Sequence, residues 1–158
     1  MLIAVHIASF AVQADKNTPL VVLQETGKAR TVAVPVTASE ASAIAIKSLN
    51  VACEKPLTVD VLKMAVDAFG ARLNKVVVRA ANEEFSARLY IHADSLAKII
   101  ECGAGDGIAL AMRCCSPLFV NEEIFLEKGA VEVTQDTEAL RKAIASTATL
   151  EFGTYYLQ

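Results

Sequence analysis

Tryptophan is absent from this chain of 158 residues, and aromatic residues make up only 6% of it. Side chains on which single-stranded bases could stack are therefore scarce. Clustered positive charge is scarce too, because 15 Lys and Arg residues stand against 18 Asp and Glu residues, a net charge of −3. Since phosphate affinity comes from clustered Lys and Arg, the composition excludes a strongly basic nucleic-acid binder. Any nucleic acid would need a local patch, a bridging metal or a transient contact.

The sequence also lacks the common signatures of metal and nucleotide sites. Its four cysteines, Cys53, Cys102, Cys114 and Cys115, form no C-x-x-C motif, so a zinc site is not expected. We interpret them as buried, small apolar residues in a reducing cytosol, with a redox switch at Cys114-Cys115 as the alternative. No G-x-S-x-G, P-loop or dinucleotide-binding fingerprint occurs.

Long hydrophobic runs are missing as well, and none reaches the length of a membrane span. The segment Met1–Ala14 is apolar, and Val12-Gln13-Ala14 resembles the end of a signal-peptide cleavage site, but no Lys or Arg precedes Lys16. A signal peptide carries a positively charged n-region. We therefore expect a buried strand over Leu2–Val12, no membrane association and a cytoplasmic location.

Apolar residues are abundant: 54% of the chain is hydrophobic and 21% is charged. This balance excludes intrinsic disorder. A chain of this size buries about two-thirds of its surface on folding, which is enough for a core without metals or disulfides. The hydrophobic fraction exceeds what a small monomer needs, so we expect a subunit interface and a homo-oligomer, either a dimer or a larger assembly.

Periodicity and turn residues divide the chain into alternating strands and helices. Helix starts are expected where a polar cap precedes an apolar periodic run, at Ser39, Thr58, near Asp106 and at Asn121. The expected strands are Leu2–Val12, Pro19–Leu23, Thr31–Val36, Leu73–Arg79, Phe85–His92, Lys98–Glu101 and Pro117–Val120. The expected helices are Ala41–Leu49, Val59–Phe69, Gly107–Cys115, Glu122–Glu127 and Glu138–Ser146.

Two segments resemble each other within the chain. Glu40–Lys47 aligns without gaps on Asp106–Arg113, and Pro-Leu follows each, at Pro56-Leu57 and Pro117-Leu118. This similarity predicts an α+β fold made of duplicated strand-strand-helix-helix halves that share one mixed sheet core. Chance similarity between alanine-rich helices is the alternative.

The alignment places Glu40 and Asp106 at equivalent helix starts, and Asp60 lies in the first turn of the helix between them. Carboxylates are hard oxygen ligands, so three that converge would bind Mg²⁺ or Mn²⁺ and leave positions for water and phosphate. Such an ion activates water and stabilises charge on a phosphoryl centre. The alternative is that each acid only complements its helix dipole, which contributes about 0.3–1 kcal/mol.

An ordered set of motifs resembles the bifunctional nuclease (BFN) domain family over Met1–Lys128. The motifs are Val21–Glu25, Thr37–Ala45, Lys55–Leu62, Gly105–Arg113 and Pro117–Val120. The resemblance implies one α+β domain over residues 1–128 that forms homo-oligomers. Residues 129–158 lie outside the resemblance, and we expect a C-terminal helix and tail that packs on the same domain or on a neighbouring subunit. It also implies nuclease activity on DNA and RNA, with Glu40, Asp60 and Asp106 on matching positions.

Three positions differ from the family pattern. Val59 stands where a His is usual, Gly103 where an Arg is usual and Gly105 where a Ser is usual. Without the Arg, this chain lacks a cation that would contact phosphate. Without the His, it lacks an imidazole that could act as a general base. Two hypotheses follow. The first is a metal-assisted nuclease in which Lys55, Arg88 or Arg113 neutralises phosphate. The second is a non-catalytic oligomeric binding or regulatory module.

Overall fold

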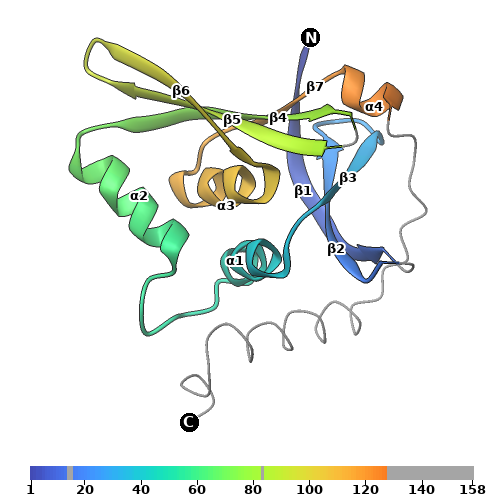
Figure 1. Cartoon of the computed structure of the whole chain (residues 1–158), viewed down its shortest axis with the longest axis horizontal. Coiled ribbons are helices and arrows are strands. Elements are labelled where there is room, and N and C mark those ends of the chain that lie inside the picture. Colours follow the sequence, from blue (N-terminus) through green and yellow to red (C-terminus); the bar gives the residue numbers. More distant parts are fainter. Residues whose placement is uncertain (14–15, 83, 128–158) are drawn as a thin grey trace.

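A single seven-stranded mixed sheet organises the chain, with helices packed on one of its faces (Figure 1). The computed structural model describes residues 1–13, 16–82 and 84–127. The strands are β1 (Leu2–Gln13), β2 (Thr18–Glu25), β3 (Thr31–Pro35), β4 (Arg72–Ala81), β5 (Glu84–Ala93), β6 (Leu96–Gly103) and β7 (Leu118–Asn121). The helices are α1 (Ala38–Ser48), α2 (Thr58–Ala68), α3 (Ala104–Cys114) and α4 (Glu123–Glu127).

The sheet has the strand order β3-β2-β1-β7-β4-β5-β6. All neighbours are antiparallel except β4 and β7, which run parallel. The expected strand Leu2–Val12 is confirmed as β1, and the short β7 joins the two halves of the sheet at its centre. Since β3 and β6 have one neighbour each, both lie at edges.

The core lies between the sheet and the helices α1 and α3. Alternation along β5 predicts its inner face correctly, because Ala87 and Leu89 are buried and Phe85 and Ile91 pack against the same cluster. Helix α3 contributes Ile108 and Leu110, and α1 contributes Ile44. Burial of such apolar side chains contributes about 1.5–3 kcal/mol each, so the helix–sheet contact supplies most of the stability.

The helix caps differ from those that the sequence indicates. Thr37, not Ser39, caps α1: its side chain accepts a hydrogen bond from the Glu40 N–H at 3.2 Å. Thr58 is the first residue of α2, and Leu57 occupies the cap. Asn121 ends β7 instead of capping a helix, since α4 begins at Glu123. At each of these helix starts the sequence offers neighbouring residues that could be the cap, so it does not fix the residue at which the helix begins.

The glycine-rich segment after β6 also differs from the expected bend. Gly103 is the last residue of β6 and Ala104 the first of α3, so the strand passes directly into the helix. Strand β6 is correspondingly longer than the expected Lys98–Glu101. The α+β class and the single mixed sheet are confirmed. The duplicated halves are not confirmed: each half supplies three strands before its helices, and β7 separates α3 from α4.

The expectation that the cysteines are buried is wrong for Cys53 and Cys115, which are exposed, whereas Cys102 and Cys114 are partly buried. The expected helix over Glu138–Ser146 and the tail lie outside the described residues, as does any boundary between a domain over 1–128 and the residues 129–158. In the described part of the chain, no helix is both long and apolar enough to cross a membrane.

Candidate active site

All three predicted site acids are the third residue of a helix. Glu40 follows the cap of α1 by three positions, Asp60 that of α2 and Asp106 that of α3. An acid at this position can accept a hydrogen bond from the backbone N–H of the cap residue. The Thr37 N–H donates to Glu40 Oε2 at 2.6 Å, and the Leu57 N–H donates to Asp60 Oδ2 at 2.8 Å. The interpretation that these acids stabilise helix starts therefore holds for Glu40 and Asp60.

The carboxylates of Glu40 and Asp106 lie together where α1 and α3 begin. A Cβ atom built on Gly103 would lie 3.1 Å from Glu40 Oε1 and 3.7 Å from Asp106 Oδ2, so oxygens of both acids lie close to one point. Gly105 permits this approach, because a Cβ there would lie 2.6 Å from Glu40 Oε2. Heavy atoms do not approach that closely without displacement, so a side chain at 105 would displace Glu40.

The Glu40 carboxylate disfavours the ionisation of Asp106. Partial burial, and secondly the Glu40 carboxylate, raise the pKa of Asp106 above its usual range. Like charges that share a site disfavour ionisation in this way. No other described residue forms an ion pair or side-chain hydrogen bond with Asp106. Asp106 is therefore the acid of this pair whose charged form the site disfavours.

An open groove adjoins this pair. Its volume is about 500 Å³, and it lies between the β1–β2 turn, the start of α1 and the start of α3. Asn17, Thr37, Glu40, Phe85 and Gly105 are among its lining residues. None of the described residues that line it is Lys or Arg, so a bound phosphate would meet no cation among them.

Asp60 lies in a different arrangement. Arg113 Nε donates to Asp60 Oδ1 at 2.5 Å, and the Arg113 side chain is only 4% exposed. The same guanidinium donates to the Ala109 carbonyl at 3.1 Å and to the Ala43 carbonyl at 3.0 Å. Burial works to raise the pKa of Asp60, but the hydrogen bonds from Leu57 and Arg113 together hold it below its usual range. Arg113 therefore joins α1, α2 and α3 to each other.

The three acids do not form one centre. In the ranges 1–13, 16–82 and 84–127, no group of three or more His, Cys, Asp or Glu side chains is placed to hold a metal ion. The structure brings Glu40 and Asp106 together and pairs Asp60 with Arg113. Neither predicted phosphate-binding arginine is free, because Arg88 donates to Glu101 at 2.6 Å and Arg113 is buried. Lys55 lies exposed between α1 and α2.

Sequence reasoning missed two features beside these acids. Cys102, half-buried near the pair, has its pKa raised to about 11 by burial, then by Asp106 and Glu40, so its thiol stays protonated at neutral pH. The role of Arg113 was missed as well, although a lone cation within an apolar helix is a signal for a buried partner.

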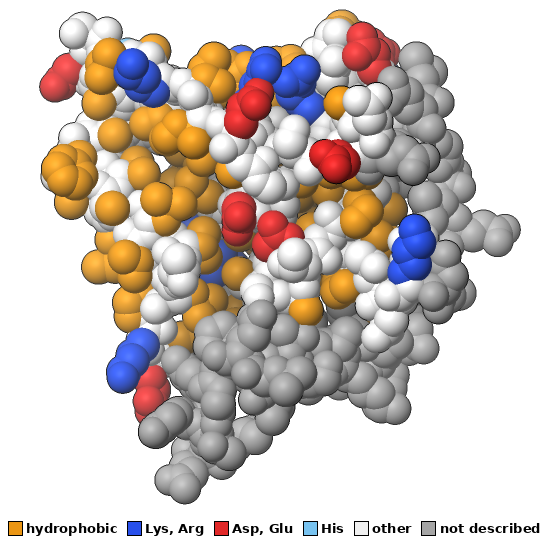
Figure 2. Space-filling view, viewed as in Figure 1, with side chains coloured by type: hydrophobic (Ala, Val, Ile, Leu, Met, Phe, Trp, Pro, Cys, Tyr) orange, Lys and Arg blue, Asp and Glu red, His pale blue; other side chains and the backbone are white. Residues whose placement is uncertain are grey.

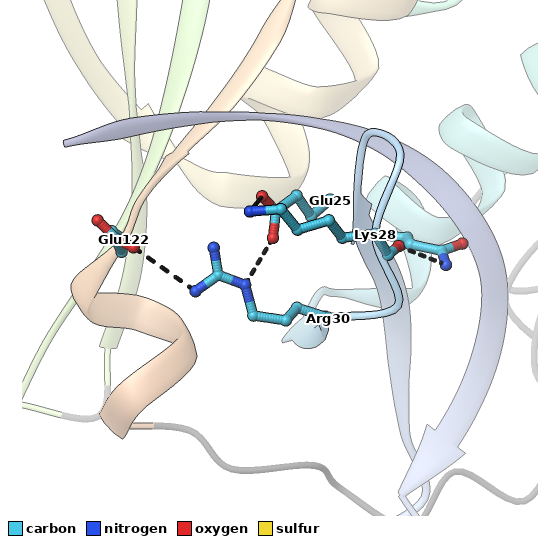
Figure 3. A network of polar contacts seen from close by, with 5 residues as sticks. Glu25, Lys28, Arg30 and Glu122 are labelled. Atoms are coloured by element: carbon cyan, nitrogen blue, oxygen red, sulfur yellow. Dashed lines mark hydrogen bonds and ion pairs between the residues drawn. The ribbon is translucent and has the colours of Figure 1, made fainter.

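A second polar network lies at the end of β2, beside the core, and is structural. Arg30 Nε donates to Glu25 Oε2 at 2.5 Å, and Lys28 Nζ lies 3.1 Å from Glu25 Oε1 (Figure 3). Arg30 also lies 3.6 Å from Glu122 Oε1 and 4.8 Å from the centre of the Phe125 ring. The hydrogen bond from Arg30 is the main reason that the pKa of Glu25 is lowered. The network ties the β2–β3 hairpin to α4.

Sequence comparison relates this chain to known proteins. An uncharacterised protein, matched in two strains of Mycobacterium tuberculosis, is 26% identical over 141 residues, which cover 89% of this chain and 84% of the relative. The family model of the bifunctional nuclease domain matches residues 21–133. That range includes Glu40, Asp60 and Asp106, as well as the departures at Val59, Gly103 and Gly105. The chain therefore belongs to the bifunctional nuclease domain family.

Proposed function

We propose that this chain hydrolyses phosphodiester bonds of DNA or RNA with the help of a divalent cation, Mg²⁺ or Mn²⁺, held by Glu40 and Asp106. The observation that carries the proposal is the placement of two carboxylate oxygens within 3.7 Å of one point above Gly103. Membership of a nuclease family supports the reaction class.

The donor set fits such a cation. Mg²⁺ is usually bound through one or two carboxylates and keeps several waters, so a pair of acids suffices. The raised pKa of Asp106 reflects an unfavourable charge that a cation would relieve. When bound, the ion would supply an activated water and would stabilise charge on the phosphoryl oxygens.

The residues of the chain have separate tasks in this proposal. Asp106 would hold the ion with one carboxylate oxygen and could accept a hydrogen bond from the attacking water with the other. Glu40 keeps one oxygen on the Thr37 N–H, which leaves the other beside Gly103. Asp60 acts as a positioning residue, because its pair with Arg113 holds α3 against α1 and α2.

A cleavage assay with a matched control tests the proposal. Fluorescent single-stranded and double-stranded oligonucleotides are incubated with the full chain and Mg²⁺ or Mn²⁺, beside Asp106→Asn and Asp94→Asn. Asp94 is exposed at the β5–β6 turn with φ 48°, a conformation that Asn also adopts. We expect metal-dependent cleavage that Asp106→Asn abolishes and Asp94→Asn retains. Equal cleavage by both variants, or none by the wild type with either ion, would refute it.

Binding of the ion supplies a readout that is independent of turnover. Mn²⁺ titrated into the wild type and followed by electron paramagnetic resonance is expected to bind one site per chain. Asp106→Asn is expected to weaken that binding at least tenfold, because one of two anionic ligands is lost. Unchanged binding would place the ion elsewhere.

A non-catalytic binding or regulatory module is the second candidate. The observation that favours it is the groove without Lys or Arg among its described lining, beside Gly103 where the family usually has an Arg. Val59, where a His is usual, packs against the core instead of meeting the groove. A wild type that binds Mn²⁺ but leaves every oligonucleotide intact would favour this candidate.

A further inference from the structure

The face of the sheet that points away from α1 and α3 carries a cluster of positive charge on β4 and β5. Ala87 and Leu89 of β5 face the core beneath the helices, so the alternate residues of this strand point the other way. Residues opposite each other in register share a face. Four basic side chains therefore lie on the outer face: Arg72, Lys75, Arg79 and Arg88. Figure 2 shows basic side chains in the upper part of the view, where Figure 1 shows these strands.

Acidic side chains balance only part of this charge. Among the residues described for β4, β5 and β6, two acids lie on the same face, Glu84 and Glu101. The outer face of these strands is therefore positive, although the whole chain has a net charge of −3. A surface of this sign attracts a polyanion and repels an acidic protein surface.

Glu101 lies between two of the four cations. Arg88 Nε donates to Glu101 Oε1 at 2.6 Å, whereas Arg79 Nη1 lies 3.7 Å from the same oxygen. A nitrogen–oxygen hydrogen bond needs about 2.7–3.2 Å, so Arg79 has an ion pair with Glu101 but no hydrogen bond to it. One carboxylate balances the charge of one guanidinium. Arg79, whose side chain is 40% exposed, is therefore the cation of this cluster that an external anion can engage.

Arg79 lies in one row with the pair of acids at the starts of α1 and α3. Arg79 is opposite Ser86 in register, and Ser86 is opposite Gly103. Oxygens of Glu40 and Asp106 lie beside Gly103. Neighbouring strands are about 4.8 Å apart, so roughly 10 Å separates the backbones of Arg79 and Gly103. At the rise of about 3.4 Å per nucleotide that one strand has in a duplex, about three nucleotides cover this distance.

We propose that Arg79 binds a phosphate of a single nucleic-acid strand, a few nucleotides away from the bond that Glu40 and Asp106 would cut. This inference rests on the proposed function, because the strand has to reach the acid pair. A polyanion requires cations, and the groove beside the acids has no Lys or Arg among its described lining residues. The outer face of the sheet supplies the cation instead. A guanidinium suits this task, because it binds phosphate through two parallel hydrogen bonds.

The path between the two sites selects a single strand. Arg79 lies on the outer face of the sheet, whereas the groove lies at the starts of α1 and α3, on the side of the helices. The edge strand β6 separates the two sites, so the substrate has to bend around its end within roughly 10 Å. A duplex has a persistence length of about 150 base pairs and resists such a bend. A single strand does not.

Glu101 weakens the contact in the same arrangement. Its hydrogen bond from Arg88 keeps the carboxylate beside Arg79, where it competes with a phosphate for the guanidinium. Arg79→Gln and Glu101→Gln are therefore expected to change binding in opposite directions. A purely structural role of this cluster would weaken binding in both variants.

Binding without turnover tests the proposal. A short fluorescent single-stranded oligonucleotide is titrated with the full chain and followed by anisotropy, with Asp106→Asn present in every protein so that nothing is cut. Arg79→Gln should weaken binding about tenfold, because a charge-assisted hydrogen bond is lost, and Glu101→Gln should tighten it. Lys98→Gln is the matched control, since Lys98 lies opposite Ile91 on the other face of the sheet. Equal binding by Arg79→Gln and Lys98→Gln, or no binding by any protein, would overturn the proposal.

The salt dependence identifies the contact as one with phosphate. Arg79→Gln should reduce the slope of log K against log salt by about 0.7, the value for one phosphate of a single strand. Arg79→Lys keeps the charge and should keep the slope. The change should be the same for oligo(dT) and oligo(dA), because backbone contacts carry no sequence information. Weaker binding by Arg79→Gln with an unchanged slope would contradict the phosphate contact.

Cleavage kinetics separate this inference from the proposed function. In the chain with Asp106 intact, Arg79→Gln should raise KM and leave kcat unchanged, since the phosphate is held equally before and during the reaction. Cleavage with the same KM in the wild type and Arg79→Gln would refute the role of Arg79 alone. Binding with the expected salt slopes but no cleavage by the wild type would refute the proposed function alone.

Discussion

Replacing Asp60 with Asn is expected to destabilise the fold by about 2–3 kcal/mol, although Asn keeps an oxygen for the same hydrogen bond. Removing one partner of a buried ion pair costs about 3–5 kcal/mol. The Arg113 side chain is 4% exposed but the Asp60 side chain is 33% exposed, so solvent screening reduces this cost. The cost arises because the guanidinium stays buried without a counter-charge.

Replacing the other partner of this ion pair, Arg113, is expected to reduce the stability less than replacing Asp60 does. Arg113→Met keeps the apolar stem and leaves Asp60, which water can reach, so we expect a loss of about 1–2 kcal/mol. The double variant Asp60→Asn/Arg113→Met should therefore be more stable than Asp60→Asn alone. This order distinguishes an uncompensated buried cation from the simple loss of a contact.

Urea unfolding followed by circular dichroism measures these differences, with Asp67→Asn as the control from the same helix. Asp67 is 54% exposed in its pair with Lys63, and such surface pairs contribute about 0–1 kcal/mol. The pKa of Asp60 is lowered in the folded chain, so its contribution is lost as the pH falls below about 4. An Asp60→Asn variant within about 0.5 kcal/mol of the wild type at pH 7 would refute the reasoning.

Three further predictions concern α3 and the residues around it. Gly107→Ala should destabilise the fold by about 1–3 kcal/mol in urea unfolding, because the new Cβ would overlap the Ala87 Cβ and lie 3.3 Å from Val76 Cγ1; an unchanged midpoint would contradict that packing. Asp106→Asn should raise the urea midpoint at pH 7 and lose this advantage as the pH falls toward 4, because an acid with a raised pKa destabilises the fold above its unfolded value; a lowered midpoint at pH 7 would contradict the sign. Cys102, with its pKa raised to about 11, should react with a thiol reagent at pH 8 at least tenfold more slowly than the exposed Cys53, as peptide mapping would show.

Local chemistry was sufficient to predict most elements and the family. Alternation along β5 and the 3.6-residue spacing in α2 are properties of neighbouring residues, so they can be recognised without a structure. The same holds for Gly70, which has φ 67° directly after the C-terminal cap of α2. The caps were less certain because Thr37 and Ser39 both offer a hydroxyl, and only the path of the chain selects one.

The sequence by itself determined that three acids stand in the first turns of three helices, because spacing and side-chain chemistry are local properties. Only the tertiary structure decided which of them meet. Gly105 lets Glu40 pack against α3 beside Asp106, whereas Arg113 neutralises Asp60 from 53 residues away. The exposed side of α2 was decided in the same way: its periodicity is visible in the chain, but the direction of its apolar face depends on how α3 and the sheet pack against it.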